Sequence, residues 1–434
     1  MQHILVIGAG RSATSLIEYL LDQSSTQQWK VTVADLSLNL AQQKVNNHSA
    51  GNAIALDTAD EQARRNSIAQ ADIVVSMLPA FMHITIANDC LALGKHLVTA
   101  SYVSPEMQAL HQEAKAKNLI FLNEMGLDPG IDHMSAMQII DRIHGQGGKI
   151  TSFKSYCGGL VAPESNDNPW GYKFSWNPRN VVVAGQSGAH YLENGQQVHL
   201  PYSSIFAAPV VFQLNQHESF DGYPNRDSLS YQAVYGLNHV ATLIRGTLRE
   251  LGYCQAWQAL VLMGLTDDQI QLELPTNTTW AHWAGKRYEL LVIENSAFAD
   301  EVVKQKLAWL GLFDSKPLGK TIGTAATILL DLLESKWVLQ PHDKDRIVMI
   351  HHFTYELNKK VYHLQSALDL IGTDTLHTAM AKTVGLPLGI GVKLIHQQNI
   401  KARGVMIPIS SEIYEPALAQ LAKAGIRFIE AELN

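Results

Sequence analysis

Short apolar runs alternate with amphipathic segments up to about residue 125 of the chain. Six such runs carry Val, Ile, Leu and Phe almost without interruption, which is typical of strands buried on both faces of a parallel sheet. They are HILVIG, WKVTVAD, AIALD, DIVVSML, HLVTAS and LIFLNE. The segments between them, such as RSATSLIEYLLDQ, place leucines at helical spacing. This alternation predicts right-handed βαβ crossovers and an α/β fold with a doubly wound parallel sheet.

The pattern changes after the sixth run. Residues 126–240 are rich in Gly, Pro, Asn and aromatic side chains, which predicts more loops than further βα units would have. Residues from about 240 to 340 read as mostly helical, in segments such as VATLIRGTLRELG and AATILLDLLESK. Residues 346–370 alternate apolar and polar positions, as antiparallel strands returning to a sheet would. The tail from Thr378 is predicted to be helical.

A glycine-rich turn, GAGRSA, directly follows the first predicted strand. Gly8 permits the tight turn, Gly10 lets a pyrophosphate approach the backbone, and Ala13 lets the next helix pack closely on the strand. The diphosphate of a dinucleotide would then lie on free N–H groups at the positive end of that helix. The position of this turn at the start of a series of βα units strengthens a motif that is weak by itself.

Asp35 ends the second predicted strand, 25 residues after Gly10. An acidic side chain there accepts hydrogen bonds from the ribose hydroxyls and repels a 2′-phosphate, which favours NAD over NADP. The alternative is that Asp35 is only a turn residue before the next helix. With the strand, the glycine-rich turn and the acid aligned, we predict a bound dinucleotide, with NAD preferred.

Ligands of a doubly wound sheet bind beyond the carboxyl ends of its strands. Asp57 and Thr58 follow the third predicted strand, although they could simply cap the next helix. Further strand ends lie at Leu78-Pro79, at Ala100-Ser101-Tyr102 and at Glu124. The additional candidate cofactor-binding residues are therefore Arg11, Ser12, Asp57, Thr58, Leu78, Pro79 and Ala100.

Charge and cysteine content narrow the class of protein. The chain of 434 residues has 33 Lys and Arg against 40 Asp and Glu, a net charge of −7. This balance argues against a nucleic-acid partner and an anionic membrane surface, and no apolar run is long enough for a membrane helix. Three cysteines and an N-terminus without a signal-peptide pattern predict a reducing, cytoplasmic setting. We expect no metal site, and an anionic ligand would require locally concentrated positive charge.

Several polar residues outside the sheet are candidates for chemistry. The turn EMGLDPGIDH, residues 124–133, contains Asp128, which could bond its own backbone or hold a substrate. Cys157 lies beside two glycines in SYCGG, where a buried packing role is the alternative. Arginines recur in or near predicted loops, although a surface arginine usually has no specific role. They are Arg179, Arg226, Arg245 and Arg249.

The longest strings around these residues resemble those of the glutamate-forming saccharopine dehydrogenase family. They are NEMGLDPGIDHM, SYCGGLVAPESNDNPWGYKFSW, GYPNRDS, IRGTLRELGY, AMAKTVGLP and SEIYEP. The resemblance extends from about residue 3 to 425 and is thinnest between about 265 and 345. It implies an oxidoreductase of lysine metabolism that acts on a CH–NH bond. Saccharopine, water and a nicotinamide dinucleotide would give L-glutamate and 2-aminoadipate 6-semialdehyde.

The resemblance also implies a domain arrangement. Residues 1–126 would form a Rossmann-type dinucleotide-binding domain, rejoined by about 378–434. Residues 127–377 would form a mixed α/β substrate-binding domain with a mostly helical insertion at about 240–340.

The family's ligand contacts can be carried over to matching positions of this chain. Its cofactor contacts add Leu127 and Ser175 to those above. Its saccharopine contacts fall on Ser101, Tyr102, Asp128, Arg226, Arg245, Gly246 and Thr247. Saccharopine carries three carboxylates, which guanidinium groups can orient by bidentate pairing. The predicted catalytic residues are Asp128 and Cys157 near the substrate amine, with Tyr102 as a positioning donor.

The resemblance leaves alternatives open. Fungal members that make lysine use NADP and replace the acid after the second strand, whereas Asp35 is similar to the acid of catabolic, NAD-using members. An NADP-linked reductase in the biosynthetic direction, or a related enzyme such as carboxynorspermidine dehydrogenase, is the alternative among enzymes. A non-catalytic dinucleotide-sensing protein is the alternative from another class, but it would not need the arginines or the Asp128 turn. Saccharopine is the expected partner molecule, and a homodimer stays open.

Overall fold

The computed structural model describes residues 1–433 of the chain. The chain divides into two compact units, which are treated separately below. Unit 1 comprises Met1–Gly145 and Leu376–Phe428, and unit 2 comprises Gln146–Thr375 and the described residues after Phe428. This division differs from the expected border at residue 126, because helix α7 (Ile131–Gly145) lies in unit 1. It also differs at the C-terminal end, where residues beyond Phe428 lie in unit 2.

Unit 1 is built around a seven-stranded sheet in the order β18-β6-β5-β4-β1-β2-β3. Every neighbouring pair of these strands is parallel. Six strands are the predicted apolar runs: β1 (Gln2–Ile7), β2 (Trp29–Asp35), β3 (Gly51–Ala55), β4 (Ile73–Ser76), β5 (His96–Thr99) and β6 (Ile120–Leu122). The seventh is β18 (Gly404–Met406). The predicted doubly wound sheet is confirmed, and its order reverses between β1 and β4, where such folds bind ligands.

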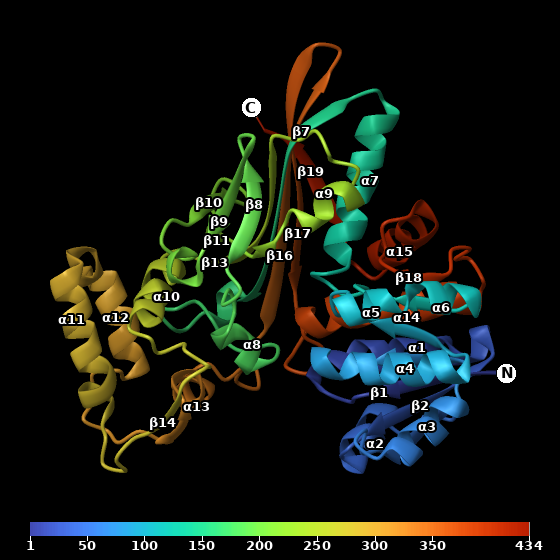
Figure 1. Cartoon of the computed structure of the whole chain (residues 1–434), viewed down its shortest axis with the longest axis horizontal. Coiled ribbons are helices and arrows are strands. Elements are labelled where there is room, and N and C mark those ends of the chain that lie inside the picture. Colours follow the sequence, from blue (N-terminus) through green and yellow to red (C-terminus); the bar gives the residue numbers. More distant parts are fainter. Residues whose placement is uncertain (434) are drawn as a thin grey trace. The chain divides into compact units, whose positions relative to one another are not determined.

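Helices lie on both faces of this sheet (Figure 1). The helices of unit 1 are α1 (Thr14–Gln27), α2 (Leu38–Val45), α3 (Glu61–Ala69), α4 (His83–Leu93), α5 (Pro105–Ala109), α6 (His111–Ala116), α7, α14 (Ala379–His396) and α15 (Ser411–Lys423), and α7 and α15 pack on each other. α14 packs closely on α1, because a Cβ atom at Gly385 would lie 2.6 Å from the backbone nitrogen of Leu16. This contact ties the C-terminal part of the chain to α1. The predicted helical tail is confirmed for α14 and α15, but Gly404–Met406 and Phe428–Glu432 form strands instead.

Unit 2 contains a ten-stranded mixed sheet. Its main path runs β10-β11-β13-β7-β16-β17-β19, with β8, β9 and β12 attached at the side. The strands are β7 (Lys149–Val161), β8 (Ala189–Glu193), β9 (Gln196–Leu200), β10 (Val210–Gln213), β11 (Ser219–Pro224), β12 (Arg226–Asp227), β13 (Thr242–Glu250), β16 (Asp345–Leu357), β17 (Lys360–Ile371) and β19 (Phe428–Glu432). β13 and β7 are parallel, whereas β16 is antiparallel to β7 and to β17. The predicted antiparallel pair at 346–370 is therefore confirmed.

Two predictions for this part of the chain are wrong. Thr242–Glu250 was expected to be helical but forms β13 in the middle of the sheet. Its sequence TLIRGTLRE has apolar residues at a spacing that fits a helix face as well as a strand, and sheet pairing on both sides decides for the strand. The region after residue 126 was expected to be too rich in loops for α/β units, yet it forms α7 followed by β7. No Gly or Pro occurs between Gly130 and Gly145, so the segment after the turn can form a helix.

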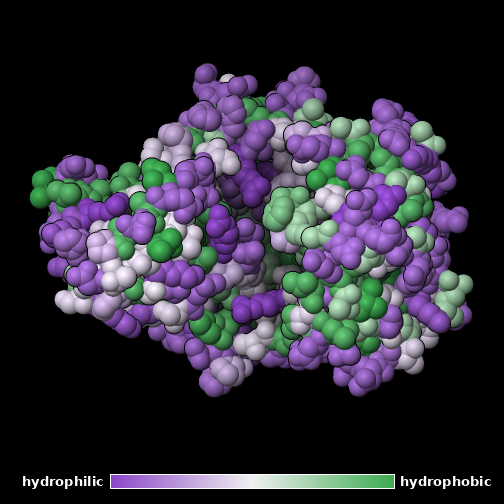
Figure 2. Space-filling view, turned by 60° about the horizontal axis from the view of Figure 1, so that its bottom comes forward, coloured by the Kyte–Doolittle hydropathy of each residue, from purple (hydrophilic) through white to green (hydrophobic). Residues whose placement is uncertain are grey.

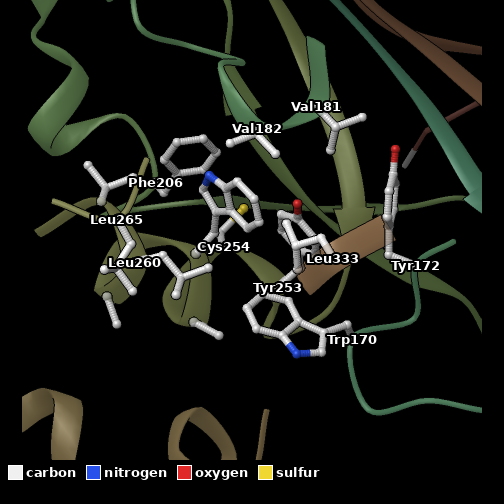
Figure 3. Packing of buried hydrophobic residues seen from close by; sticks show 14 of the residues in the cluster. Trp170, Tyr172, Val181, Val182, Phe206, Tyr253, Cys254, Leu260, Leu265 and Leu333 are labelled. Carbon is white, nitrogen blue, oxygen red and sulfur yellow. The ribbon is translucent and has the colours of Figure 1, made fainter. Parts of the chain in front are cut away.

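The helices of unit 2 pack on an aromatic core. They are α8 (Pro178–Val182), α10 (Tyr253–Leu262), α11 (Lys286–Glu294), α12 (Glu301–Leu310) and α13 (Ala325–Lys336). The short helix α9 (Ser230–Val234) and the small antiparallel pair β14 (Gln271–Glu273) and β15 (Ile322–Thr324) complete the unit. Figure 3 shows Trp170, Tyr172 and Tyr253 gathered in this core. The Trp170 and Tyr253 rings meet edge to face at 5.5 Å, and Trp170 Nε1 donates to the carbonyl of Lys306. The helical part of the insertion is thereby anchored to the loop that contains Ser175.

Hydrophobic residues on the visible face occur in small groups among hydrophilic ones (Figure 2). All three cysteines are buried and none forms a disulfide. Within residues 1–433, no helix has the length and hydropathy that crossing a bilayer requires.

Candidate dinucleotide and substrate site

The glycine-rich turn joins β1 to α1 in unit 1. Gly8 has φ +106°, and a Cβ atom there would lie 3.1 Å from the carbonyl oxygen of Met77, so only glycine fits without strain. Gly10 is exposed, and a Cβ atom there would meet no protein atom within 4 Å. Ala13 is buried at the start of the helix. The predicted turn geometry is present, and the open side of Gly10 leaves room for a diphosphate to approach the backbone.

The Asp35 carboxylate is tied to this turn. Its Oδ2 accepts the backbone N–H of Ala9 at 2.8 Å, and its Oδ1 accepts that of Ser37 at 2.9 Å. The second bond is the turn-residue role that the sequence left as an alternative, and Ser37 then caps α2. The first bond fixes a half-exposed negative charge between the end of β2 and the glycine-rich turn. Asp35 therefore has a structural role in the turn and can also face a ribose.

The other strand ends of unit 1 place the remaining cofactor candidates at the same edge of the sheet. Asp57 Oδ1 accepts the N–H of Ala59 at 2.9 Å in the loop after β3. Asp60 caps α3, so the alternative that Asp57 or Thr58 caps this helix is wrong. The loops after β4 and β5 contain the other candidates, and most of them are partly or fully exposed. They are Leu78, Pro79, Ala100, Ser101 and Tyr102, while Arg11 and Ser12 lie beside Gly10.

Tyr102 and Asp128 meet at this edge. The Tyr102 hydroxyl donates to Asp128 Oδ1 at 3.0 Å, and Asp128 is exposed. The neighbouring Leu127 is buried. Two of the three predicted catalytic residues are thus in direct contact, in a position open to solvent. A carboxylate with a phenol as its partner can exchange a proton with a bound amine and can be oriented while it does so.

The turn that carries Asp128 is tightly constrained. Gly130 has φ +147°, and a Cβ atom there would lie 2.1 Å from the carbonyl oxygen of Gly126. The N–H of Gly126 donates to the carbonyl of Pro129 at 2.9 Å, and the N–H of Ile131 returns to the carbonyl of Gly126 at 2.9 Å. The Asp128–Pro129 peptide bond is cis. The Gly and Pro residues of GLDPG therefore hold the Asp128 side chain at a defined place.

A buried pair behind this turn was not selected by the sequence analysis as a functional pair. Glu124 Oε1 accepts the N–H of Val103 at 2.9 Å, and its Oε2 lies 2.8 Å from His133 Nε2. Glu124 is 3% exposed and His133 is fully buried. Because Val103 follows Tyr102 and His133 lies on α7, this carboxylate links the Tyr102 segment to the helix after the Asp128 turn. In the sequence, both residues belong to the string EMGLDPGIDH, but nothing in this string shows that Glu124 and His133 pair. Their contact forms only when the turn folds.

The substrate candidates of unit 2 gather on β7 and β13. Cys157 is the register neighbour of Thr247, and Ser155 is the neighbour of Arg245. Side chains of paired residues point to the same face, so Cys157, Thr247 and Arg245 share one face of the sheet. Gly246 lies between the latter two and packs against the Tyr156 ring on the other face.

The two arginines of this group have different environments. Arg245 is 7% exposed, and its guanidinium lies 4.3 Å from the centre of the Tyr231 ring. Arg226 is exposed and its backbone has φ +55°. Together with Asp227 it forms the short strand β12. The residue before it, Asn225, donates from Nδ2 to Thr247 Oγ1 at 3.3 Å, and its N–H donates to the Arg245 carbonyl at 2.9 Å. Asn225 thus holds Arg226 next to β13. The string YPNRDS includes Asn225, but its spacing does not indicate this role.

The remaining candidates lie elsewhere in unit 2. Ser175 is buried in the loop before α8. Arg179 is exposed and 3.7 Å from Asp268, and Arg249 is buried among Tyr172 and Tyr253. Within residues 1–433, no group of His, Cys, Asp and Glu side chains is arranged to hold a metal ion.

Comparison with known families identifies the family to which these residues belong. The model of the saccharopine dehydrogenase C-terminal domain matches residues 126–426, and that of the saccharopine dehydrogenase NADP binding domain matches residues 4–122. The chain belongs to the saccharopine dehydrogenase family. The predicted family and a domain that binds a nicotinamide dinucleotide are thereby confirmed, and the glycine-rich turn described above fits such a ligand.

Individual saccharopine dehydrogenases are similar over the whole chain. A Schizosaccharomyces pombe protein named saccharopine dehydrogenase [NADP(+), L-glutamate-forming] is 34% identical over 99% of both chains. The mitochondrial alpha-aminoadipic semialdehyde synthase of Bos taurus is also 34% identical, but this chain covers 47% of it. The apo saccharopine dehydrogenase (L-Glu forming) of Saccharomyces cerevisiae has a TM-score of 0.89 at 32% identity and full coverage of both chains. A homospermidine synthase from Legionella pneumophila, at 9% identity and a TM-score of 0.60, shares the fold.

Proposed function

We propose that this chain oxidises saccharopine to L-glutamate and 2-aminoadipate 6-semialdehyde. The observation that carries the proposal is the Tyr102–Asp128 pair at the ligand edge of a saccharopine dehydrogenase, 3.0 Å apart and open to solvent. The similarity to an L-glutamate-forming relative over 99% of both chains supports the choice of products. The reaction consumes water, and a nicotinamide dinucleotide held at the glycine-rich turn would supply the acceptor for the hydride of the lysine-derived carbon next to the secondary amine.

Side chains of the protein would transfer the protons of the substrate amine. The secondary ammonium of saccharopine must lose a proton before its neighbouring carbon can lose a hydride, and we assign the acceptance of that proton to Asp128. Tyr102 donates to the same carboxylate and so keeps it oriented. Loss of the hydride leaves a carbon–nitrogen double bond, to which water adds at carbon. Cleavage of the carbon–nitrogen bond, with a proton returned to nitrogen, then releases glutamate and leaves the aldehyde.

Arg226 and Arg245 are proposed to bind carboxylates of the substrate. Arg245 is buried against Tyr231, which keeps its fork in a fixed orientation, and Asn225 holds Arg226 next to β13. Guanidinium groups bind carboxylates bidentately, and a desolvated pair is stronger than an exposed one. Cys157 shares the sheet face of Arg245 and is proposed as a second proton-transfer group.

The choice between NAD and NADP has support on both sides. The family model names an NADP binding domain, and the relatives from Schizosaccharomyces pombe and Saccharomyces cerevisiae are named for NADP(+). Asp35, however, fixes a negative charge next to the glycine-rich turn through its bond to Ala9. A 2′-phosphate beside this carboxylate would be repelled. We therefore propose NAD as the preferred dinucleotide, with NADP as the alternative that the relatives favour.

A steady-state assay of saccharopine oxidation with each dinucleotide tests both proposals. We expect turnover with saccharopine, a higher kcat/KM with NAD than with NADP, and a reversal of part of this preference in Asp35→Ser. A kcat/KM with NADP that equals or exceeds the value with NAD in the unchanged protein would show that Asp35 does not select NAD. Turnover with carboxynorspermidine but not with saccharopine would replace the proposed substrate, and no turnover with either would favour a dinucleotide-binding protein without this activity.

A further inference from the structure

A buried histidine spans the ends of two neighbouring strands at the ligand edge of unit 1. His83 begins α4 and is 5% exposed. Its Nδ1 lies 2.8 Å from Ser76 Oγ at the end of β4, and its Nε2 lies 2.7 Å from Ser101 Oγ just beyond β5. A longer contact of 3.2 Å joins Nε2 to Thr99 Oγ1. His83 therefore connects the interior of the sheet to Ser101, which is half exposed next to Tyr102.

The partners of Ser76 decide which ring nitrogen carries the proton. Ser76 is 1% exposed, and its hydroxyl has His83 Nδ1 as its hydrogen-bond partner among residues 1–433. A buried hydroxyl proton without an acceptor costs about 1–3 kcal/mol, and this applies to Thr99 as well, which is also 1% exposed and meets the ring at Nε2. The neutral ring can accept from only one side, and the 2.8 Å contact of Ser76 is stronger than the 3.2 Å contact of Thr99, so Ser76 donates to Nδ1. Burial lowers the pKa of His83 to about 4, so the ring is neutral near pH 7 and holds one proton. With Nδ1 as acceptor, that proton is on Nε2.

The tautomer in turn sets what Ser101 offers to a ligand. The Nε2–H group donates to Ser101 Oγ across the shortest of the three contacts. One lone pair of Ser101 is then used, and its own hydroxyl proton is left to point away from His83. In the opposite tautomer, Ser101 would donate its hydroxyl proton to Nε2. Its oxygen could then only accept a hydrogen bond from a ligand. The Ser76–His83–Ser101 series thus makes Ser101 a hydrogen-bond donor at the edge of the site.

We propose that His83 is a positioning residue that holds Ser101 as a donor to a carboxylate of the substrate. This inference rests on the proposed function, since the carboxylate is assigned to saccharopine. A donor hydroxyl suits an anionic group, whereas an acceptor hydroxyl would suit an ammonium group. The series therefore contributes to the selection of a substrate rich in carboxylates without adding a charge to the site.

A double-mutant cycle tests whether His83 acts through Ser101. We expect His83→Leu and Ser101→Ala each to raise the KM for saccharopine about tenfold and to leave the affinity for the dinucleotide unchanged. His83→Gln, whose amide can donate in place of Nε2–H, should recover much of the loss. In the Ser101→Ala background, His83→Leu should have no further effect on KM. Additive effects in the double variant would overturn the proposal, because they would mean that His83 supports the site in another way.

A matched control and a direct reading of the tautomer complete the test. His96 lies at the other end of β5 and accepts the N–H of Ile120 at 3.1 Å, so His96→Gln should leave KM unchanged. In ¹⁵N-histidine-labelled protein without ligand, the resonances lost in His83→Gln identify His83. We expect a protonated Nε2 and an unprotonated Nδ1, and the reverse assignment would overturn the proposal. This reading needs no substrate, so it remains decisive if saccharopine proves not to be turned over.

Discussion

The ligand edge of unit 1 contains side chains whose positions are fixed by short hydrogen bonds. Tyr102 donates a hydrogen bond to Asp128, and Asp35 accepts one from the backbone of the glycine-rich turn. Glu124 connects the segment after Tyr102 to helix α7. Such bonds restrict rotamers before a ligand arrives, which lowers the cost of binding and proton transfer.

Asp128 is expected to carry most of the proton transfer. Asp128→Asn keeps the size of the side chain but cannot accept the proton of the substrate amine, so kcat should fall by about 10²–10⁴-fold. Tyr102→Phe removes only the orienting bond and should lower kcat by about tenfold. Steady-state kinetics at saturating dinucleotide provide the measurement. An unchanged kcat in Asp128→Asn would remove this residue from the proton-transfer step.

Arg226 offers a test of carboxylate binding. Arg226→Ala should raise the KM for saccharopine by about 10²-fold or more, since a charge-assisted bidentate pair is lost, while the dissociation constant of the dinucleotide stays the same. Arg179 is a matched control, because it is also exposed and its nearest acid, Asp268, is 3.7 Å away. Arg179→Ala should behave as the unchanged protein. If both variants raise KM equally, the effect is one of general charge and Arg226 has no specific role.

His83 makes stability depend on pH. Its pKa is lowered to about 4 by burial, against about 6.5 in an unfolded chain. Between these values the unfolded chain binds a proton that the folded protein does not, so stability is lost as the pH falls from about 6.5 towards 4. At pH 5 the loss from this one group is about 2 kcal/mol. Urea unfolding at pH 7 and pH 5 should show that His83→Leu loses about 2 kcal/mol less than the unchanged protein on acidification, and an equal loss would contradict the burial effect.

At the residue scale, the sequence predicts side chains whose role follows from spacing. Asp35 and Gly10 are identified by their distance from a strand and a turn, and Asp128 by its turn. Asn225, His83 and the Glu124–His133 pair are not, because their partners are brought together only by the fold. Ser76 and His83, for example, belong to β4 and α4, while Ser101 lies beyond β5.

At the scale of elements, the turn between β6 and α7 is the best-defined local structure of the site. Gly130→Ala would place a Cβ atom 2.1 Å from the carbonyl oxygen of Gly126 at φ +147°. We expect a loss of at least about 2 kcal/mol in the free energy of unfolding and a lower kcat, because Asp128 shifts with the turn. Urea unfolding provides the measurement.

Gly145, at the end of the same helix, is the control for this variant. A Cβ atom there would meet nothing within 4 Å, so Gly145→Ala should be neutral or stabilise by up to about 1 kcal/mol. A Gly130→Ala protein as stable as Gly145→Ala would show that the turn can relax, contrary to the geometry described above.

The elements differ in how well the sequence predicts them. The strands of unit 1 are continuous apolar runs because helices cover both faces of their sheet, so they are easy to recognise. β13 is misread because its apolar residues fit both periods, and its place between β11 and β7 is a long-range property. α7 is missed because the Gly and Pro of the preceding turn dominate the local composition.

At the scale of the whole molecule, the net charge of −7 shapes how an anionic ligand can be bound. A substrate with three carboxylates and an anionic dinucleotide cannot rely on a generally basic surface. The candidate groups are instead a helix start beside Gly10 and a small number of arginines, of which Arg245 is buried. Buried charges are screened by salt far less than exposed ones. The acidic composition therefore argues against nucleic acid but not against anionic small molecules.

The identity of the products shows which carbon of saccharopine loses its hydride. The purified protein should be incubated with saccharopine and NAD, and the reduced dinucleotide, L-glutamate and lysine should be quantified. We predict one L-glutamate for each reduced dinucleotide and no lysine, because the hydride leaves the lysine-derived carbon and water cleaves the resulting carbon–nitrogen double bond. Formation of lysine in place of glutamate, or no reaction with either NAD or NADP, would contradict the account.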